Sequence, residues 1–199
     1  MNKSKKRTVK TIVFMLVFAI MIISAYFIIK TRTSPFVTES VSTMTEVEKL
    51  LAKDVPNSYP SSPREVLKLY SRISKVLYNG DLKEEQVDKL ADQMLCLYDK
   101  ELILNKSHED YLIDLKVDIS NYKKANRIIM NYVIEASSSV LFWDIEDENY
   151  SSIVAAYTMK EKSDYSKVFE KFTLRKDKDD KWKILGWDLS DKTEIEPGE

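Results

Sequence analysis

Nineteen consecutive residues without a charge, from Thr11 to Ile29, are the feature that most constrains this 199-residue chain. An α-helix needs about 20 predominantly apolar residues to cross the hydrocarbon core of a bilayer, so we predict a transmembrane helix over residues 11–29. Five cations lie within residues 1–10, and Lys30 and Arg32 follow the run. Because short cytoplasmic segments carry the excess of Lys and Arg, we expect a single-pass protein of the cell membrane, with residues 1–10 inside and the C-terminal domain outside.

A cleaved signal peptide is the alternative interpretation of this segment, because secretory signals also begin with a charged stretch and an apolar run. No A-x-A cleavage motif is present; the nearest match is Ile23-Ser24-Ala25, and the apolar run continues past it to Ile29. Both observations favour a retained anchor.

The rest of the chain has the length of one folded domain. Residues 30–61, rich in Ser, Thr and Pro, are predicted to be a linker with a weakly helical patch over 45–53. We expect one extracytoplasmic domain over 62–190 and a disordered tail over 191–199.

Charge and cysteine content limit which partners the domain can bind and what can stabilise its fold. Outside residues 1–10 the chain carries 26 Lys and Arg against 32 Asp and Glu, and such an acidic balance argues against nucleic acid, whose phosphates are bound by clustered cations. The single cysteine, Cys96, excludes an internal disulfide. A hydrophobic core must therefore hold the domain together.

The first helix of the domain has clear signals at both ends. Ser62-Pro63-Arg64-Glu65 matches a capping box with proline at the first helical position. An apolar stripe at helical spacing then runs from Val66 to Leu77. Asn79-Gly80 predicts a left-handed stop.

Further helices are indicated by the same kinds of signal. Asp81 is predicted to cap a second amphipathic helix, and residues 99–104 are predicted to form a short helical turn. Ser107, with Asp110 three residues later, opens a third helix. Three capped helices are therefore expected before any strand.

From Arg127 onward the residues are β-branched and aromatic, in runs separated by short polar turns. Connections this short favour antiparallel neighbours. The predicted strands are 127–135, 140–146, 151–160, 165–176 and 181–189. Helices that precede strands in this way predict an α+β domain, with three helices packed on one face of a curved antiparallel sheet of four or five strands.

This order of elements, ending in the hairpin around residues 176–184, resembles the cone-shaped nuclear transport factor two-like superfamily over about Ser62 to Leu189. Several segments also look like a family of single-span membrane proteins of Gram-positive gut bacteria that has no assigned activity. These segments are Tyr59-Pro60, the helix of 62–78, Leu97-Tyr98-Asp99-Lys100-Glu101-Leu102, Leu174-Arg175-Lys176 and Lys181-Trp182-Lys183-Ile184-Leu185-Gly186-Trp187. The resemblance implies a fold and a location in the bacterial cell envelope, but no chemistry.

Glu170 is the one ionisable residue that strand alternation places among apolar neighbours. Within 168–175 it shares a face with Val168, Phe172 and Leu174. Enzymes of the cone superfamily act through ionisable residues inside the cone, and burial raises the pKa of a carboxyl group into a range that suits proton transfer. The alternative, that Glu170 faces solvent or forms a cross-strand pair with a lysine (Lys160 or Lys183), is favoured because one acid without a visible partner is not a catalytic set.

Aromatic residues supply the remaining candidates for binding. Trp143, Tyr157 and Trp182, together with Tyr150, Tyr165 and Trp187, suit either the filling of a core or the lining of a groove for a sugar or peptide. Core filling is favoured. We retain Trp143, Tyr157, Glu170 and Trp182 as candidate binding residues.

We expect no metal ion and no cofactor. His108 is the only histidine, and histidine metal sites need further ligands. The acidic runs Glu146-Asp147-Glu148 and 177–180 lack the glycine and the distal glutamate of a calcium loop, so they are predicted to be solvated hairpin turns. Nucleophilic use of Cys96 would require a histidine in reach, and the single candidate, His108, lies one loop away, so a packing role is favoured.

Three functions remain open at this point, the simplest being that the domain only stabilises or spaces a protein encoded nearby. The first of the other two is a non-enzymatic, membrane-tethered binding or scaffold module of the cell envelope, whose partner is a protein or an envelope ligand. Its architecture is similar to that of scaffold subunits of bacterial conjugation and secretion channels, so self-association is one form it could take. The second is a small hydrolase, dehydratase or isomerase that uses Glu170 in a pocket lined by Tyr157 and Trp182.

Overall fold

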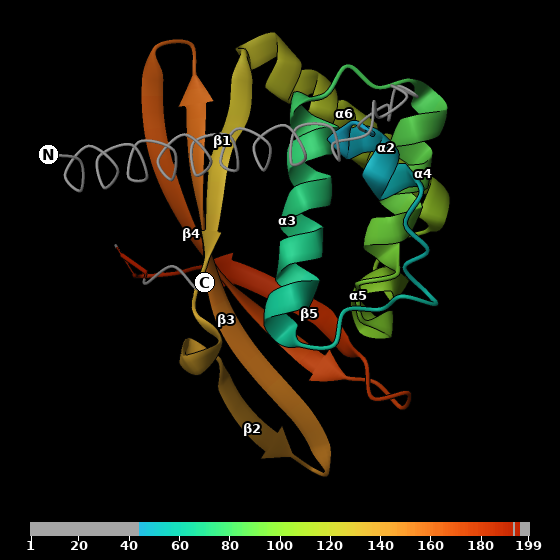
Figure 1. The fold of residues 1–199 in the computed structure, drawn as a ribbon, viewed down its shortest axis with the longest axis vertical. Helices are drawn as coiled ribbons and strands as arrows, with labels where there is room; N and C mark the ends of the chain where they lie inside the picture. The colour runs from blue at the N-terminus through green and yellow to red at the C-terminus, as the bar shows by residue number, and fades with distance from the viewer. Residues whose placement is uncertain (1–43, 193, 196–199) are drawn as a thin grey trace, which may run out of the picture. The chain divides into compact units, whose positions relative to one another are not determined.

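The computed structural model describes residues 44–192 and 194–195 (Figure 1). The predicted span over 11–29 and the tail 1–10 lie outside these residues. In the part of the chain that is described, no helix is both long and apolar enough to cross a membrane. The described residues belong to one compact unit, Met44–Glu199.

This unit has an α+β fold with five helices and an open antiparallel sheet of five strands, which confirms the predicted class. The helices are α2 (Glu46–Leu51), α3 (Pro63–Asn79), α4 (Glu84–Leu95), α5 (Lys100–Leu104) and α6 (His108–Ala125). The strands are β1 (Arg127–Ile134), β2 (Leu141–Ile145), β3 (Glu148–Glu161), β4 (Asp164–Lys176) and β5 (Trp182–Leu189), with a 3₁₀ turn, η1 (Ser137–Ser139), between β1 and β2.

The sheet departs from a simple meander at its first two strands. Its order is β1-β3-β4-β5, and β2 pairs with β3 rather than with β1. The pairing of β1 ends at Ile134 opposite Ala155, and the pairing of β2 begins at Leu141 opposite Ser152. Because β3 has 14 residues, it is long enough to pair with both shorter strands along the same edge. Glu135, the residue after β1, fixes the connection between β1 and β2 to β3, because its carboxylate accepts a hydrogen bond from the Val154 amide (2.9 Å).

Three helices begin where their capping residues predict. The Ser62 hydroxyl accepts a hydrogen bond from the Glu65 amide (3.3 Å) at the start of α3. The Ser107 hydroxyl accepts one from the Asp110 amide (3.1 Å) at the start of α6. Asp99 caps α5 in the same way. These local hydrogen bonds satisfy backbone donors that have no partner within the helix.

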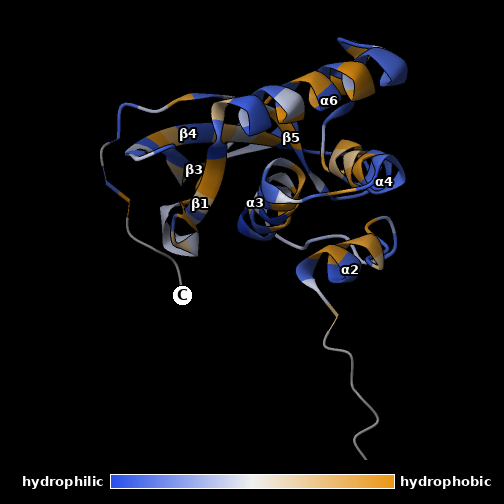
Figure 2. Cartoon of the chain, turned by 90° about the horizontal axis from the view of Figure 1, so that it is seen from above, coloured by the Kyte–Doolittle hydropathy of each residue, from blue (hydrophilic) through white to orange (hydrophobic). Residues whose placement is uncertain are grey.

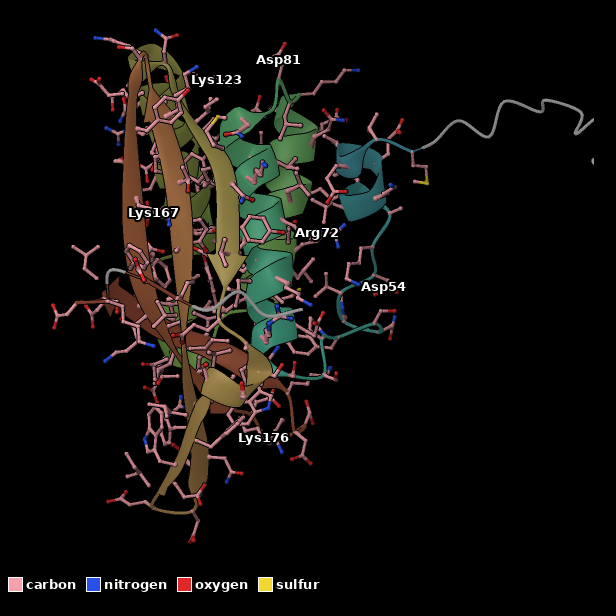
Figure 3. The ribbon with its side chains drawn as sticks, turned by 60° about the vertical axis from the view of Figure 1, so that its left-hand side comes forward. Asp54, Arg72, Asp81, Lys123, Lys167 and Lys176 are labelled. Carbon is pink, nitrogen blue, oxygen red and sulfur yellow. The ribbon has the colours of Figure 1, made fainter. Side chains whose placement is uncertain are left out.

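The predicted start of the second long helix at Asp81 is wrong. The N-cap of α4 is Lys83, whose backbone amide donates to the Gln86 side chain (2.9 Å). Asp81 instead lies beside Lys123 at the end of α6, with the charged atoms 3.6 Å apart (Figure 3). The Asp81 side chain is fully exposed, and the helix is capped two residues later than predicted.

The predicted left-handed stop after α3 is also wrong. Gly80 has φ −78° and ψ 152°, which is extended backbone. A Cβ atom at this position would lie 2.6 Å from the Val76 carbonyl oxygen. Glycine is therefore suited to this site by close approach rather than by positive φ. Asn79 joins the helix end to β1, because its amide group donates to the Ile129 carbonyl and accepts from the Ile129 amide (both 2.8 Å).

The helices gather on one side of the sheet, as the view from above shows (Figure 2). Helix α3 contacts β1, β3 and β5, and α6 contacts β1. Helix α4 packs against α2, α3 and α6. The main core therefore lies between α3 and the sheet, with α4 forming a second helical layer.

The compact unit starts within the predicted linker. Leu50 of α2 and Val55 after it are fully buried in the core. The Gln93 amide donates to the Leu50 carbonyl (2.8 Å), and Arg72 of α3 pairs with Glu46 of α2 (2.8 Å; Figure 3). The helical patch predicted around residues 45–53 is thus a packed part of the fold.

Candidate functional site

A hollow of about 420 Å³ lies between α3, the end of α6 and the inner face of the sheet. We call it the tyrosine pocket. It is lined by Tyr70, Ser74, Tyr78, Tyr122, Arg127, Ile129, Tyr157, Met159, Glu161, Ser166, Val168, Glu170 and Trp187. Its volume falls in the range of small-ligand sites.

The regular periods of helix and strand bring these side chains together. Tyr70, Ser74 and Tyr78 are four residues apart along α3, so they lie on one face of the helix. On the sheet, Tyr157 of β3 is paired with Val168 of β4, and paired residues point to the same side. The pocket is therefore enclosed by one helix face and one sheet face.

Glu170 lies on the inner face of the sheet, as strand alternation predicts. It is paired with Ala155 on one side and Leu189 on the other. Burial raises the pKa of its carboxyl group above the usual value. The alternative cross-strand ion pairs are not formed, because Lys183 donates to the Cys96 carbonyl (2.7 Å) and Lys160 lies over the Tyr165 ring.

The tyrosines around Glu170 remain neutral hydroxyl groups. Burial raises the pKa of Tyr70, Tyr78 and Tyr157, and the nearby Glu170 charge raises each of them further. The Tyr157 hydroxyl is hydrogen-bonded to the Ser71 hydroxyl (2.8 Å), which fixes its position. The pocket thus combines polar hydroxyls with aromatic rings around one carboxyl group.

The cation in the lining is already paired. Two nitrogens of Arg127 donate to one carboxylate oxygen of Glu161 (2.8 and 2.6 Å). The Arg127 guanidinium also lies over the Tyr122 ring, 5.2 Å from its centroid. Among the described residues that line the pocket, Glu170 is thus the acid without an ion pair.

Trp187 separates the tyrosine pocket from a neighbouring hollow. Its ring stacks on Phe172 (5.8 Å between centroids) and lies 6.1 Å from both Tyr70 and Tyr98. The second hollow, of about 290 Å³, has a mainly apolar lining that includes Tyr98, Leu102 and Trp187. One tryptophan therefore forms a wall of both spaces.

The structure brings two of the four predicted binding residues, Tyr157 and Glu170, to this pocket, but not the other two. Trp143 of β2 stacks on Tyr150 (5.9 Å). Trp182 is paired with Lys176 and packs near Phe142.

Trp182 does not reach the tyrosine pocket because β4 is long. Lys176 is six residues beyond Glu170 on β4, so the two are separated by roughly 20 Å along the strand. Figure 3 shows how far β4 extends between Lys167 and Lys176. The expected pocket lined by both Tyr157 and Trp182 is therefore not formed.

The sequence alone does not single out several of the lining residues. Tyr70 falls within the apolar stripe of the first helix, and no motif marks Tyr78, Tyr122 or Arg127 as a site residue. One local signal is available: the spacing of Tyr70, Ser74 and Tyr78 places three polar groups on the helix face that meets the sheet.

A second charged cluster has a structural role. Arg175, at the end of β4, forms two hydrogen bonds to Asp99 (3.1 and 2.6 Å), and their side chains are 8% and 4% exposed. It also pairs with Glu101 and Glu148 (2.9 and 3.2 Å). These contacts join α5 to the sheet and the start of β3 to the end of β4, and they leave Arg175 fully engaged.

The candidate metal residues are not clustered. His108 is exposed and bonds to Asp92 (2.8 Å). Among the described residues, no group of three potential metal ligands is found. Glu146 and Asp147 both have positive φ in the turn between β2 and β3. In the turn between β4 and β5, the Asp177 side chain accepts hydrogen bonds from the backbone amides of Asp179 and Lys181. Both acidic runs are hairpin turns, as predicted.

Comparison with known proteins identifies one family. No curated protein sequence matches the chain. A family model described as a domain of unknown function, DUF6715, matches residues 1–187. The chain therefore belongs to the DUF6715 family.

Proposed function

We propose that this protein is a membrane-anchored, extracytoplasmic module of the bacterial cell envelope that binds a small ligand in the tyrosine pocket without transforming it. The observation that carries the proposal is the pocket itself: a space of about 420 Å³ with aromatic walls and one carboxyl group without an ion pair. Binding sites are typically concave and mostly apolar, with a few polar groups that orient the ligand.

The polar groups of the pocket favour binding over catalysis. Acid–base catalysis requires a proton donor or acceptor matched to a second group that stabilises the developing charge. Arg127 is engaged by Glu161, and the Ser74 hydroxyl donates to the Tyr70 carbonyl (2.9 Å). The tyrosines have raised pKa values and are weak acids. Glu170 therefore has no second group in the pocket that would complete an acid–base pair.

The anchor and the location rest on the sequence. The uncharged run over 11–29, with five cations before it, supports one span with the N-terminus inside. The helices followed by an antiparallel sheet, with a hollow between them, support the proposed nuclear transport factor two-like cone. Self-association of such domains would be an additional property.

The orientation can be tested with single cysteines in a Cys96→Ser background. Ser163→Cys lies in the exposed turn between β3 and β4, whereas Ser4→Cys lies in the predicted inner tail. A membrane-impermeant maleimide should label the first in intact cells and the second only after lysis. Labelling of Ser4→Cys in intact cells would contradict the proposed orientation.

Ligand binding can be tested by blocking the pocket. Ser166 lines the pocket, and the adjacent Lys167 is paired with Thr158 on the other face of the sheet. We propose to screen the full-length chain for thermal stabilisation by small envelope metabolites. A true ligand should stabilise the wild type and Lys167→Trp but not Ser166→Trp. A screen without hits, or a hit unaffected by Ser166→Trp, would count against the proposal.

A hydrolase, dehydratase or isomerase remains the second candidate, because the raised pKa of Glu170 suits proton transfer. It predicts that a ligand found in the screen is converted to product at a rate abolished by Glu170→Gln. Recovery of the ligand unchanged after long incubation with the wild type would exclude turnover of that ligand.

A further inference from the structure

The charges that face the tyrosine pocket do not balance. Its carboxyl and guanidinium side chains are Glu170, Glu161 and Arg127, and the last two form an ion pair in which two Arg127 nitrogens donate to one Glu161 oxygen. Tyr70 and Tyr78 of α3 and Tyr157 of β3 lie close enough for the Glu170 charge to raise their pKa values. No described side chain of the lining supplies a positive charge to Glu170. A half-buried carboxylate in this position favours a positively charged partner.

The walls of the pocket add a second preference of the same sign. The faces of tyrosine and tryptophan rings carry negative electrostatic potential and attract cations. Tyr70, Tyr78, Tyr122, Tyr157 and Trp187 all line the pocket. An anion would lie close to the Glu170 carboxyl group and to these aromatic side chains, so it is disfavoured.

One cation of the chain, Arg127, is already bound by a carboxylate and an aromatic ring at the edge of the tyrosine pocket. Arg127 lies between the Glu161 carboxylate and the Tyr122 ring, with its guanidinium 5.2 Å from the ring centroid. A carboxylate and an aromatic face thus hold one cation at the edge of the pocket. Inside, Glu170 and the remaining rings offer the same two kinds of partner.

We propose that the ligand of the tyrosine pocket is a small organic cation, whose ammonium group pairs with Glu170 and lies against the aromatic walls. This inference rests on the proposed small-ligand function and specifies the ligand class. A neutral ligand of the same shape could form hydrogen bonds with the tyrosine hydroxyls, but it would leave the Glu170 charge uncompensated.

The test compares probes that have the same shape but differ in charge. Choline is paired with 3,3-dimethylbutan-1-ol, in which carbon replaces the ammonium nitrogen, and butylamine is paired with butan-1-ol. Binding to the full-length chain is measured by isothermal titration calorimetry at pH 7 in a maltoside detergent, which has no cationic headgroup. At least one cation should bind tenfold or more tightly than its neutral counterpart.

Two variants assign the effect to Glu170. Glu170→Gln removes the charge at nearly constant shape, and it should weaken binding of the cation at least tenfold without weakening binding of the neutral probe. Glu109→Gln removes the same charge from an exposed site on α6, and it should retain wild-type affinity. Circular dichroism of both variants checks that they are folded.

The possible failures separate the two proposals. Equal binding of cation and neutral probe, lost in Ser166→Trp, would overturn the cationic ligand but support a small-ligand pocket. Cation binding that survives Glu170→Gln would also overturn it. If no probe binds, the cation inference fails, and the metabolite screen alone then decides the proposed function.

Discussion

Arg175 shows how much of this fold depends on single charged residues. Its side chain is almost fully buried and forms a two-point contact with Asp99. Asp99 in turn caps α5 through the Glu101 amide (2.9 Å). One guanidinium group therefore links a strand end, a helix start and a loop, and its removal would leave a buried carboxylate without its partner.

We expect Arg175→Met to lower the free energy of unfolding by about 3–5 kcal/mol, because an uncompensated buried charge remains at Asp99. Arg127→Met is the matched control, since the Arg127–Glu161 pair is about 40% exposed on both sides and such pairs contribute about 0–1 kcal/mol. Urea denaturation at pH 7 measures both. Similar losses in the two variants would contradict the structural role assigned to Arg175.

Glu170 should make the stability of the domain depend on pH. Because burial raises its pKa in the folded state, the folded protein binds the proton more tightly than the unfolded chain. The stability that this group contributes is therefore complete below its ordinary pKa of 4.5 and is lost as the pH rises through the folded value. Glu170→Gln should be more stable than the wild type at pH 7, and this gain should disappear below about pH 4.5.

Urea denaturation across this pH range measures the difference. A variant less stable than the wild type at pH 7 would show that the carboxylate forms a favourable contact. Glu109→Gln, at an exposed site, should show no such pH-dependent gain.

At the scale of elements, local chemistry was predictable and pairing at a distance was not. Ser62 and Ser107 cap their helices through hydrogen bonds to amides three residues away, so the sequence alone reveals them. Asp81 has the same local pattern, but it pairs with Lys123 instead. The strands were predicted within three residues of their ends, because alternation and turn residues are local signals.

The sequence could not reveal that β1 and β2 share one edge of β3. Each short run could equally have paired with the next, and the choice depends on the length of β3 and on Glu135, which accepts from Val154. The candidate site was predicted in part for the same reason. The inward position of Glu170 follows from strand period, whereas the helix residues it faces depend on how α3 crosses the sheet.

Two glycines provide an element-scale prediction with an internal control. Gly80→Ala should destabilise the domain by about 1–3 kcal/mol, because the new Cβ atom would lie 2.6 Å from the Val76 carbonyl oxygen. Gly186→Ala meets no atom within 4 Å and should be neutral or stabilise by about 0.4–1 kcal/mol. Thermal unfolding of both variants tests this contrast, and a neutral Gly80→Ala would show that the α3–α4 connection adjusts freely.

At the scale of the whole molecule, the folded unit includes residues that look like linker. The segment before α3 places Leu50 and Val55 in the core, and Gln93 bonds to the carbonyls of Leu50 and Lys53 (2.8 and 3.0 Å). The polar composition of this segment gives no sign of these few buried contacts. A domain boundary read from composition therefore falls too late in the chain.

Truncation should reveal this boundary. A chain that starts at Met44 should unfold cooperatively and be more stable than one that starts at Ser62, which loses α2 and its buried side chains. Leu50→Ala in the longer chain should cost about 2–5 kcal/mol. Urea denaturation of the three proteins measures the order, and equal stability of the two truncated chains would show that α2 adds nothing to the core.

The position of Trp187 gives the molecule a built-in optical reporter. This ring forms a wall of the tyrosine pocket and is 40% exposed, whereas Trp143 and Trp182 lie elsewhere on the sheet. With those two replaced by Phe, the fluorescence emission of the remaining tryptophan would come from the pocket wall. Its wavelength and its quenching would then follow occupancy directly, so that an unlabelled protein could report on its own ligand.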